Sequence, residues 1–187
     1  MGETNKLLLP IGHIPLIRHC ADVYCSLGMP VTAVLGHEAD RVQLALDGLP
    51  INFVTNPTHT TGKQSSIRLG LDNYSPSEAG LFIALGDQPL LEPSDIKSFC
   101  DVFLKGKRDK IMIPCHNQVR GNPVLFPPEL ALRIRSSHTP TTPRSFIDTN
   151  PELSEIYAAP NAHFTTDLDT PEDVENWTRS ARRKQPE

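Results

Sequence analysis

The chain has 187 residues, 38% of them hydrophobic, which suffices to bury one well-packed core, and we expect a single domain over residues 1–187. Its formal net charge of −4 provides no general basic field, so nucleic acid and membrane surfaces are not expected partners, and no apolar stretch approaches the roughly 20 residues of a membrane span. The four cysteines form no CxxC pair, the histidines show no zinc-site spacing and no secretory signal is evident, so we expect reduced thiols and a cytoplasmic location.

Helical and extended segments alternate in the first half of the chain. Glycines punctuate them, with Gly28 ending the first predicted helix and Gly36 following the first predicted strand. The elements predicted in order are a helix over 14–27, a strand over 31–35, a helix over about 38–47, a strand over 51–54, a helix over about 63–72 and a strand over 81–85.

The alternation continues in the second half. A helix is predicted from Ser94, as its N-cap, to about Leu104, and residues 136–145, rich in Ser, Thr and Pro, are predicted to form an exposed loop. The other predicted elements are a strand over 111–114, a break at 121–123 before a strand over 124–126, a helix opened by Pro127-Pro128, a strand over 154–158, and a last helix with Thr170 as N-cap and Pro171 as its first residue. This order predicts the α/β class: a three-layer α/β/α sandwich with a Rossmann-like, mainly parallel sheet.

The segment 81–89 is the most informative one for function. Its apolar run stops at Gly86-Asp87-Gln88-Pro89, which is typical of a buried strand with a carboxylate at its C-terminal end. Ligands of open α/β sheets bind at that edge, and a carboxylate there can hold a divalent cation beside a phosphate chain. The alternative is that Asp87 only caps the following helix.

Common signatures of three enzyme classes are absent from the sequence. There is no GxGxxG turn of a nicotinamide dehydrogenase, no GxxxxGK[ST] phosphate loop and no GxSxG elbow of a hydrolase. Polar clusters instead occur at strand ends and in loops: Asn5-Lys6, Gly62 to Ser66, Asp87, and Asp167-Leu168-Asp169. A lysine and a helix start can neutralise phosphate oxygens while two carboxylates share a Mg²⁺, so a nucleoside triphosphate site is plausible.

Each cluster also has a plain structural interpretation. Lys6 can be a solvated lysine, and Ser65 and Ser66 can be ordinary residues of a first helical turn. Asp167 and Asp169 can simply favour the N-terminus of the last helix.

Seven segments resemble one family, in the same order along the chain. They are Asn5-Lys6-Leu7-Leu8-Leu9-Pro10, Gly12 with Pro15-Leu16, Gly36-His37-Glu38, Asn56-Pro57 followed by Gly62 and Ser66, Leu85-Gly86-Asp87-Gln88-Pro89, Arg120-Gly121-Asn122-Pro123-Val124-Leu125-Phe126, and Asp167-Leu168-Asp169-Thr170-Pro171-Glu172-Asp173. The chain thereby resembles the molybdenum cofactor cytidylyltransferases, which belong to the larger group of MobA-like NTP transferases. The resemblance spans nearly the whole chain and implies a fold of the nucleotide-diphospho-sugar transferase type.

The resemblance implies transfer of CMP from CTP to a molybdopterin-type cofactor, with release of pyrophosphate and with Mg²⁺ as cofactor. A target molybdoenzyme is a further partner that it implies. The implied catalytic residues are Lys6 and Asp87, the nucleotide-binding residues are Lys6, Gly62, Ser65, Ser66 and Asp87, the acceptor-binding residues are Gly121, Asn122 and Arg144, and the metal ligands are Asp87 with Asp169 or Asp167.

The chain departs from the family pattern in two places. Family members normally have a strand and a loop of the form Ala-Ala-Gly-x-Ser-x-Arg directly before the Met-Gly that here is Met1-Gly2, so we expect the first strand and its phosphate cradle to be missing. Residues 139–144 stand where the family usually has Gly-Asp-x-Gly-x-Arg, and only Arg144 is retained.

Two alternatives follow from these departures. One is a nucleotidyltransferase that uses GTP or another acceptor, because base choice depends on few contacts. The other is a non-catalytic maturation or accessory protein that binds the cofactor or its target enzyme. The missing loop favours the accessory protein, whereas the joint presence of Lys6, Asp87 and Asp169 favours the enzyme.

Overall fold

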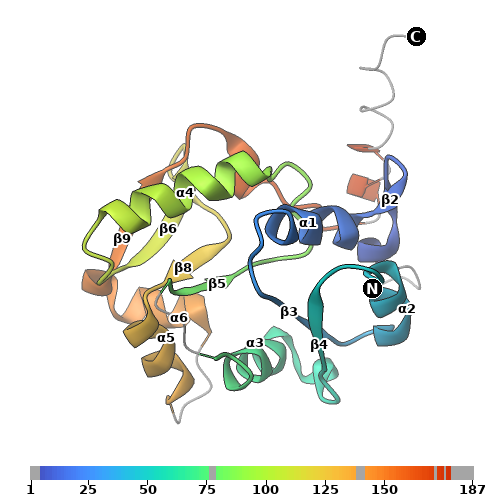
Figure 1. The fold of residues 1–187 in the computed structure, drawn as a ribbon, viewed down its shortest axis with the longest axis horizontal. Coiled ribbons are helices and arrows are strands. Elements are labelled where there is room, and N and C mark those ends of the chain that lie inside the picture. The colour runs from blue at the N-terminus through green and yellow to red at the C-terminus, as the bar shows by residue number, and fades with distance from the viewer. Residues whose placement is uncertain (1–4, 76–78, 138–141, 171, 175, 178–187) are drawn as a thin grey trace.

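Helices and strands alternate in the computed structural model, which describes residues 5–75, 79–137, 142–170, 172–174 and 176–177 (Figure 1). The helices are α1 (Leu16–Cys25), α2 (Ala39–Ala45), α3 (Lys63–Asp72), α4 (Pro93–Lys105), α5 (Pro128–Arg135) and α6 (Pro143–Thr149), with short 3₁₀ helices η1 (Lys6–Leu8), η2 (His59–Thr61), η3 (Pro151–Leu153) and η4 (Ala162–Thr165). The strands are β1 (Pro10–Ile11), β2 (Ile14–Pro15), β3 (Val31–Leu35), β4 (Ile51–Thr55), β5 (Leu81–Ile83), β6 (Ile111–His116), β7 (Val119–Arg120), β8 (Val124–Phe126) and β9 (Ser154–Ala158).

The two longest strand pairings are parallel. β3 pairs with β4 from Val31↔Ile51 to Leu35↔Thr55, and β6 pairs with β9 from Ile111↔Ser154 to Cys115↔Ala158. β8 lies antiparallel between β5 and β6, and the five-stranded sheet has the order β5-β8-β6-β7 with β9 on β6. The predicted mixed α/β fold with a parallel-rich sheet is therefore confirmed. Within the described ranges no strand joins β3 to β5.

Helices cover both faces of the larger sheet (Figure 1). On one face, Phe99 and Phe103 of α4 are buried, and the Phe99 ring lies 4.9 Å from that of Tyr157 and 5.6 Å from that of Phe164. On the other face, α5 and α6 bury the cluster that contains Phe126 and Phe146. The aromatic cluster under α4 anchors η4, which leads into the predicted metal-binding segment.

Helix boundaries differ from the prediction at α4. The helix begins at Pro93 with Glu92 as its N-cap, so the assignment of Ser94 as N-cap was wrong. The physical reason is that the Asp95 carboxylate accepts a hydrogen bond from the Glu92 backbone N–H at 3.0 Å, and Pro93 suits the first helical position. Asp87 is therefore not the cap of this helix.

The predicted loop over 136–145 was wrong at its C-terminal end, because α6 begins at Pro143. Thr142 is its N-cap: the Ser145 N–H donates to the Thr142 hydroxyl, and the Thr142 N–H donates to the Ser145 hydroxyl, each at 3.0 Å. This reciprocal pair forms a capping box despite the Ser and Thr content that suggested a loop. Residues 138–141 lie outside the described part of the chain.

The short strand β7 was not predicted. It pairs with the end of β6 through a two-residue turn in which Asn117 and Gln118 have φ of 48° and 67°. Such a left-handed pair is typical of a tight hairpin.

None of the described helices is long and apolar enough to cross a membrane.

Candidate active site

Lys6 meets two of the predicted carboxylates. Its Nζ lies 2.8 Å from Asp87 Oδ2 and 3.6 Å from Asp169 Oδ1. η1 positions the lysine, because the Asn5 side chain accepts a hydrogen bond from the Leu7 N–H and so begins the turn. The Lys6 side chain is 24% exposed, so it is a partly buried, paired lysine rather than a solvated one.

Asp87 lies just beyond β5, and its backbone as well as its side chain organises the site. The Leu168 N–H donates to the Asp87 carbonyl at 2.9 Å, which brings the segment Asp167-Leu168-Asp169 to the end of the strand. Gly86 permits close packing here, because a Cβ at this position would lie 2.5 Å from Ile17 Cδ1. Three predicted metal ligands thus share one end of the sheet.

One oxygen of Asp87 has no protein partner. Oδ2 accepts from Lys6, whereas Oδ1 is buried and has no hydrogen-bond partner among the described residues. A buried carboxylate oxygen without a partner is costly, and a bound cation would relieve that cost. The residues therefore fit a divalent metal at this oxygen.

The pKa of Asp167 is raised within the same cluster of carboxylates. The residue is exposed overall, but partial desolvation of its carboxyl group raises the pKa, and the charges of Asp87 and Asp169 raise it further. The Gln88 side chain and Lys6 oppose this shift. The described residues contain no set of three His, Cys, Asp or Glu side chains arranged to hold a metal by themselves. Mg²⁺ commonly uses one or two carboxylates plus substrate phosphates, so this partial set suits it.

The last helix is capped without using these acids. The Thr170 N–H donates to Asp173 Oδ2 at 2.8 Å, and the Asp173 N–H donates to the Thr170 hydroxyl at 3.1 Å. These bonds confirm Thr170 as the predicted N-cap, while Pro171 lies outside the described residues. Asp167 and Asp169 remain available for the site.

Gln88 belongs to the segment Gly86-Asp87-Gln88-Pro89, but no role in the site was predicted for it. It is fully buried, and its amide donates to the Phe164 carbonyl at 2.9 Å. The same carbonyl accepts the Asn122 N–H at 2.8 Å, so η4 joins the Asp87 strand end to the predicted acceptor loop. Gly121 has to be glycine here, because a Cβ would lie 2.1 Å from the Phe164 oxygen.

A second network holds the predicted nucleoside-binding segment. Asn56, at the end of β4, is 2% exposed, and its Nδ2 lies 2.9 Å from both the Ser65 and the Ser66 hydroxyl oxygens. Its Oδ1 accepts from the N–H and the hydroxyl of Thr58 at 2.9 and 3.0 Å. Asn56 thus fixes both η2 and the first turn of α3. The only sequence signal for it was the Asn-Pro pair that ends a strand.

Gly62 lies between these two elements with φ of 113°, a value that favours glycine. No hydrogen bond or ion pair in the described part of the chain joins Ser65 or Ser66 to Lys6 or Asp87. The predicted nucleotide-binding residues therefore form two separate groups.

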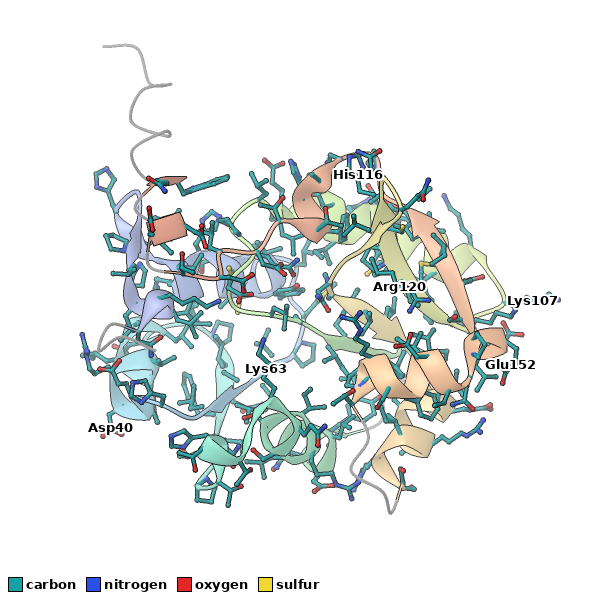
Figure 2. All side chains as sticks on the ribbon, turned by 180° about the vertical axis from the view of Figure 1, so that it is seen from behind. Asp40, Lys63, Lys107, His116, Arg120 and Glu152 are labelled. Atoms are coloured by element: carbon teal, nitrogen blue, oxygen red, sulfur yellow. The ribbon has the colours of Figure 1, made fainter. Side chains whose placement is uncertain are left out.

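Arg144 lies on α6 near Asp148 rather than in the exposed loop predicted over 136–145. Its Nε is 3.9 Å from Asp148 Oδ2, and its side chain is 90% exposed. Arg120, the residue before Gly121, donates from Nη1 to the other oxygen of the same carboxylate at 2.7 Å. Figure 2 shows Arg120 reaching from β7 toward α6.

Comparisons with known proteins agree with this fold. The pattern of the MobA-like NTP transferase domain matches residues 1–162. Rv0371c of Mycobacterium tuberculosis H37Rv, which has also been solved in complex with manganese, is 22% identical with a TM-score of 0.74, the match covering 95% of this chain and 90% of that one. A nucleotidyl transferase from Methanothermobacter thermautotroptrophicus is 18% identical with a TM-score of 0.76, covering 96% and 86% of the two chains.

A third structure extends the likeness. The 4-diphosphocytidyl-2C-methyl-D-erythritol synthase from Anaerococcus prevotii is 13% identical with a TM-score of 0.72, covering 93% of this chain and 88% of that chain. Among curated proteins, none matches significantly. The match over residues 1–162 confirms the resemblance at the level of the larger group: the chain belongs to the MobA-like NTP transferase family of nucleotidyltransferases.

Proposed function

We propose that this protein is a Mg²⁺-dependent cytidylyltransferase that transfers CMP from CTP to the terminal phosphate of a molybdopterin-type cofactor and releases pyrophosphate. The observation that carries the proposal is the convergence of Lys6, Asp87 and Asp169 at one strand end. The manganese complex of Rv0371c supports a divalent metal in such a fold. CTP and the molybdopterin acceptor follow from the sequence resemblance.

Positioning and charge neutralisation carry a reaction of this kind. An oxygen of the acceptor phosphate attacks the α-phosphorus of the nucleotide, the bond to the bridging oxygen breaks, and pyrophosphate leaves. Lys6 neutralises charge on the phosphate oxygens from its place beside Asp87. Asp87, through its unpartnered Oδ1, and Asp169 would hold Mg²⁺, which supplies charge neutralisation and alignment of the phosphates when bound.

The nucleoside would lie against the start of α3. Asn56 holds Ser65 and Ser66 in place, so the positions of their hydroxyl groups do not depend on bound ligand. The Asn122 loop lies on the acceptor side and is tied to the Asp87 strand end through Phe164. This connection would keep the distance between the bound acceptor and the metal constant during transfer.

Calorimetric titration with CTP and with GTP, each with Mg²⁺, tests the nucleotide, and pyrophosphate release with molybdopterin tests the reaction. We expect CTP to bind at least tenfold more tightly than GTP, and release of pyrophosphate to require the acceptor. Tighter binding of GTP than of CTP would show that the assignment of CTP as the nucleotide is wrong. Cofactor binding without binding of either nucleotide would instead identify an accessory protein.

A further inference from the structure

Two arginines converge on one carboxylate beside the acceptor loop. Arg120 Nη1 donates to Asp148 Oδ1 at 2.7 Å, and Arg144 Nε lies 3.9 Å from Asp148 Oδ2. The three groups carry a net charge of +1. The Arg120 and Asp148 side chains are about half exposed, at 53% and 50%, so solvent and a ligand can reach them.

The backbone of Arg120 is held firmly although its side chain is accessible. It pairs with Cys115 in the β6–β7 ladder, and the following Gly121 N–H donates to the Pro114 carbonyl at 2.8 Å. Gly121 also lies tightly against the Phe164 carbonyl, the group that binds Gln88 beside Asp87. The backbone of Arg120 is therefore held by hydrogen bonds, and Phe164 connects it to the strand end that carries Asp87.

Stability does not explain this arrangement. Exposed ion pairs contribute only about 0–1 kcal/mol, and two guanidinium groups around one carboxylate repel each other. The exposed Arg68–Asp72 pair, with atoms 3.1 Å apart, has one arginine for its carboxylate. Among the described ion pairs, only Asp148 is shared by two arginines.

We infer that Arg120 and Arg144 form a binding site for a phosphomonoester dianion, and that Asp148 holds the Arg120 guanidinium group until the dianion displaces it, while Arg144 remains 90% exposed nearby. Because the site adjoins the acceptor loop, its ligand is the phosphate of the acceptor; this last step rests on the proposed function. A dianion offers more charge and more acceptor oxygens than one carboxylate, and the planar guanidinium fork matches phosphate geometry. Asp148 thus keeps Arg120 oriented and weakens binding of other anions.

Direct binding of inorganic phosphate tests the site without any turnover. Asp148→Asn keeps the shape of the side chain and removes its charge, so it should bind phosphate about tenfold more tightly than the wild type at constant ionic strength, measured by calorimetry. Adding Arg120→Ala to Asp148→Asn should abolish this gain. Asp72→Asn is the matched control, since it removes the carboxylate partner of another exposed arginine, Arg68, and it should leave phosphate affinity unchanged. Equal gains in Asp148→Asn and Asp72→Asn, or no gain in either, would overturn the site.

Steady-state kinetics distinguish the acceptor from the nucleotide as the source of the phosphate. Arg120→Ala should raise the acceptor KM about tenfold and leave the CTP KM unchanged, and Arg120→Lys should lie between because it keeps the charge but loses the fork. A rise confined to the CTP KM would overturn the acceptor assignment. If the wild type releases no pyrophosphate, the proposed function fails, and the phosphate titration still decides whether the anion site exists.

Discussion

Two groups of residues in the candidate site differ in how completely their polar groups are paired. One is the predicted metal-binding group with its neighbour, Asp87, Gln88, Asp167 and Asp169, called the metal side; the other is Asn56 with the predicted nucleoside-binding Ser65 and Ser66, called the nucleoside side. On the metal side, Asp87 Oδ1 and Gln88 Oε1 are buried without a partner in the described part of the chain, and the pKa of Asp167 is raised. On the nucleoside side, Asn56 uses both its amide nitrogen and its amide oxygen in hydrogen bonds to Ser65, Ser66 and Thr58.

This difference indicates different tasks. Unpaired buried oxygens and crowded carboxylates reduce stability unless a ligand is bound, so such groups are retained for chemistry. A fully paired amide stabilises the fold and positions its neighbours whether or not ligand is present. Substitutions should therefore lower activity on the metal side and stability on the nucleoside side.

The largest expected effect is on turnover. Asp87→Asn should lower the rate of pyrophosphate release by about 10³-fold or more, because the charge that would hold the metal is lost. The free energy of unfolding, measured with urea, should stay within about 1 kcal/mol of the wild type, since one unpaired buried oxygen is no longer charged. Asp101→Asn, at an exposed acid of α4, is the control and should change neither quantity. Undiminished release by Asp87→Asn would contradict the role of this carboxylate.

The next effect is on stability. Asn56→Ala should lower the free energy of unfolding by about 2–4 kcal/mol, because it removes the partners of two serine hydroxyls and of Thr58. Asn52→Ala, at an exposed position of the same strand, should stay within about 0.5 kcal/mol of the wild type. Similar losses in both variants would show that the Asn56 network does not support the fold.

The third effect is on the affinity for CTP, and it is expected on substitution of Lys6. Lys6→Ala should weaken CTP binding by about tenfold to a hundredfold, and acceptor binding by much less, because Lys6 lies with the metal-side carboxylates. Titration of each ligand separately measures the two effects, with Lys97→Ala on α4 as the control for removal of a lysine. Equal losses for both ligands would argue against a contact with the triphosphate.

The smallest effect concerns pH. The pKa of Asp167 is raised in the folded protein, so its contribution to stability is present below its ordinary pKa and is lost as pH rises through the raised value. Asp167→Asn should therefore become more stable relative to the wild type between about pH 4 and about pH 7, by no more than about 0.5 kcal/mol, because the exposed residue is screened by solvent. Urea unfolding of both proteins at the two pH values measures this; a relative gain at the acidic end would reverse the assigned sign.

Local patterns predicted most of the secondary structure. The helix over 63–72 and the strand over 31–35 were predicted with the observed bounds, since apolar periodicity and flanking glycines act over a few residues. The helix starts near Ser94 and Pro143 were predicted wrongly because several residues in each segment could serve as the N-cap. In both helices the observed N-cap is fixed by reciprocal hydrogen bonds with the residue three positions later. Asp87 was identifiable because a carboxylate after an apolar strand is a local signal.

The sequence by itself determined the order of the longer helices and strands, the family, and the strand end that carries Asp87, but not the short strands β1, β2 and β7. Only the tertiary structure decided that Lys6 pairs with a residue 81 positions away, that Gln88 meets a carbonyl 76 positions away, and that Arg120 shares Asp148 with Arg144. The reason is physical: helix and strand formation depend on neighbouring residues, whereas these contacts form only after the core around Phe99 and Phe164 brings distant segments together.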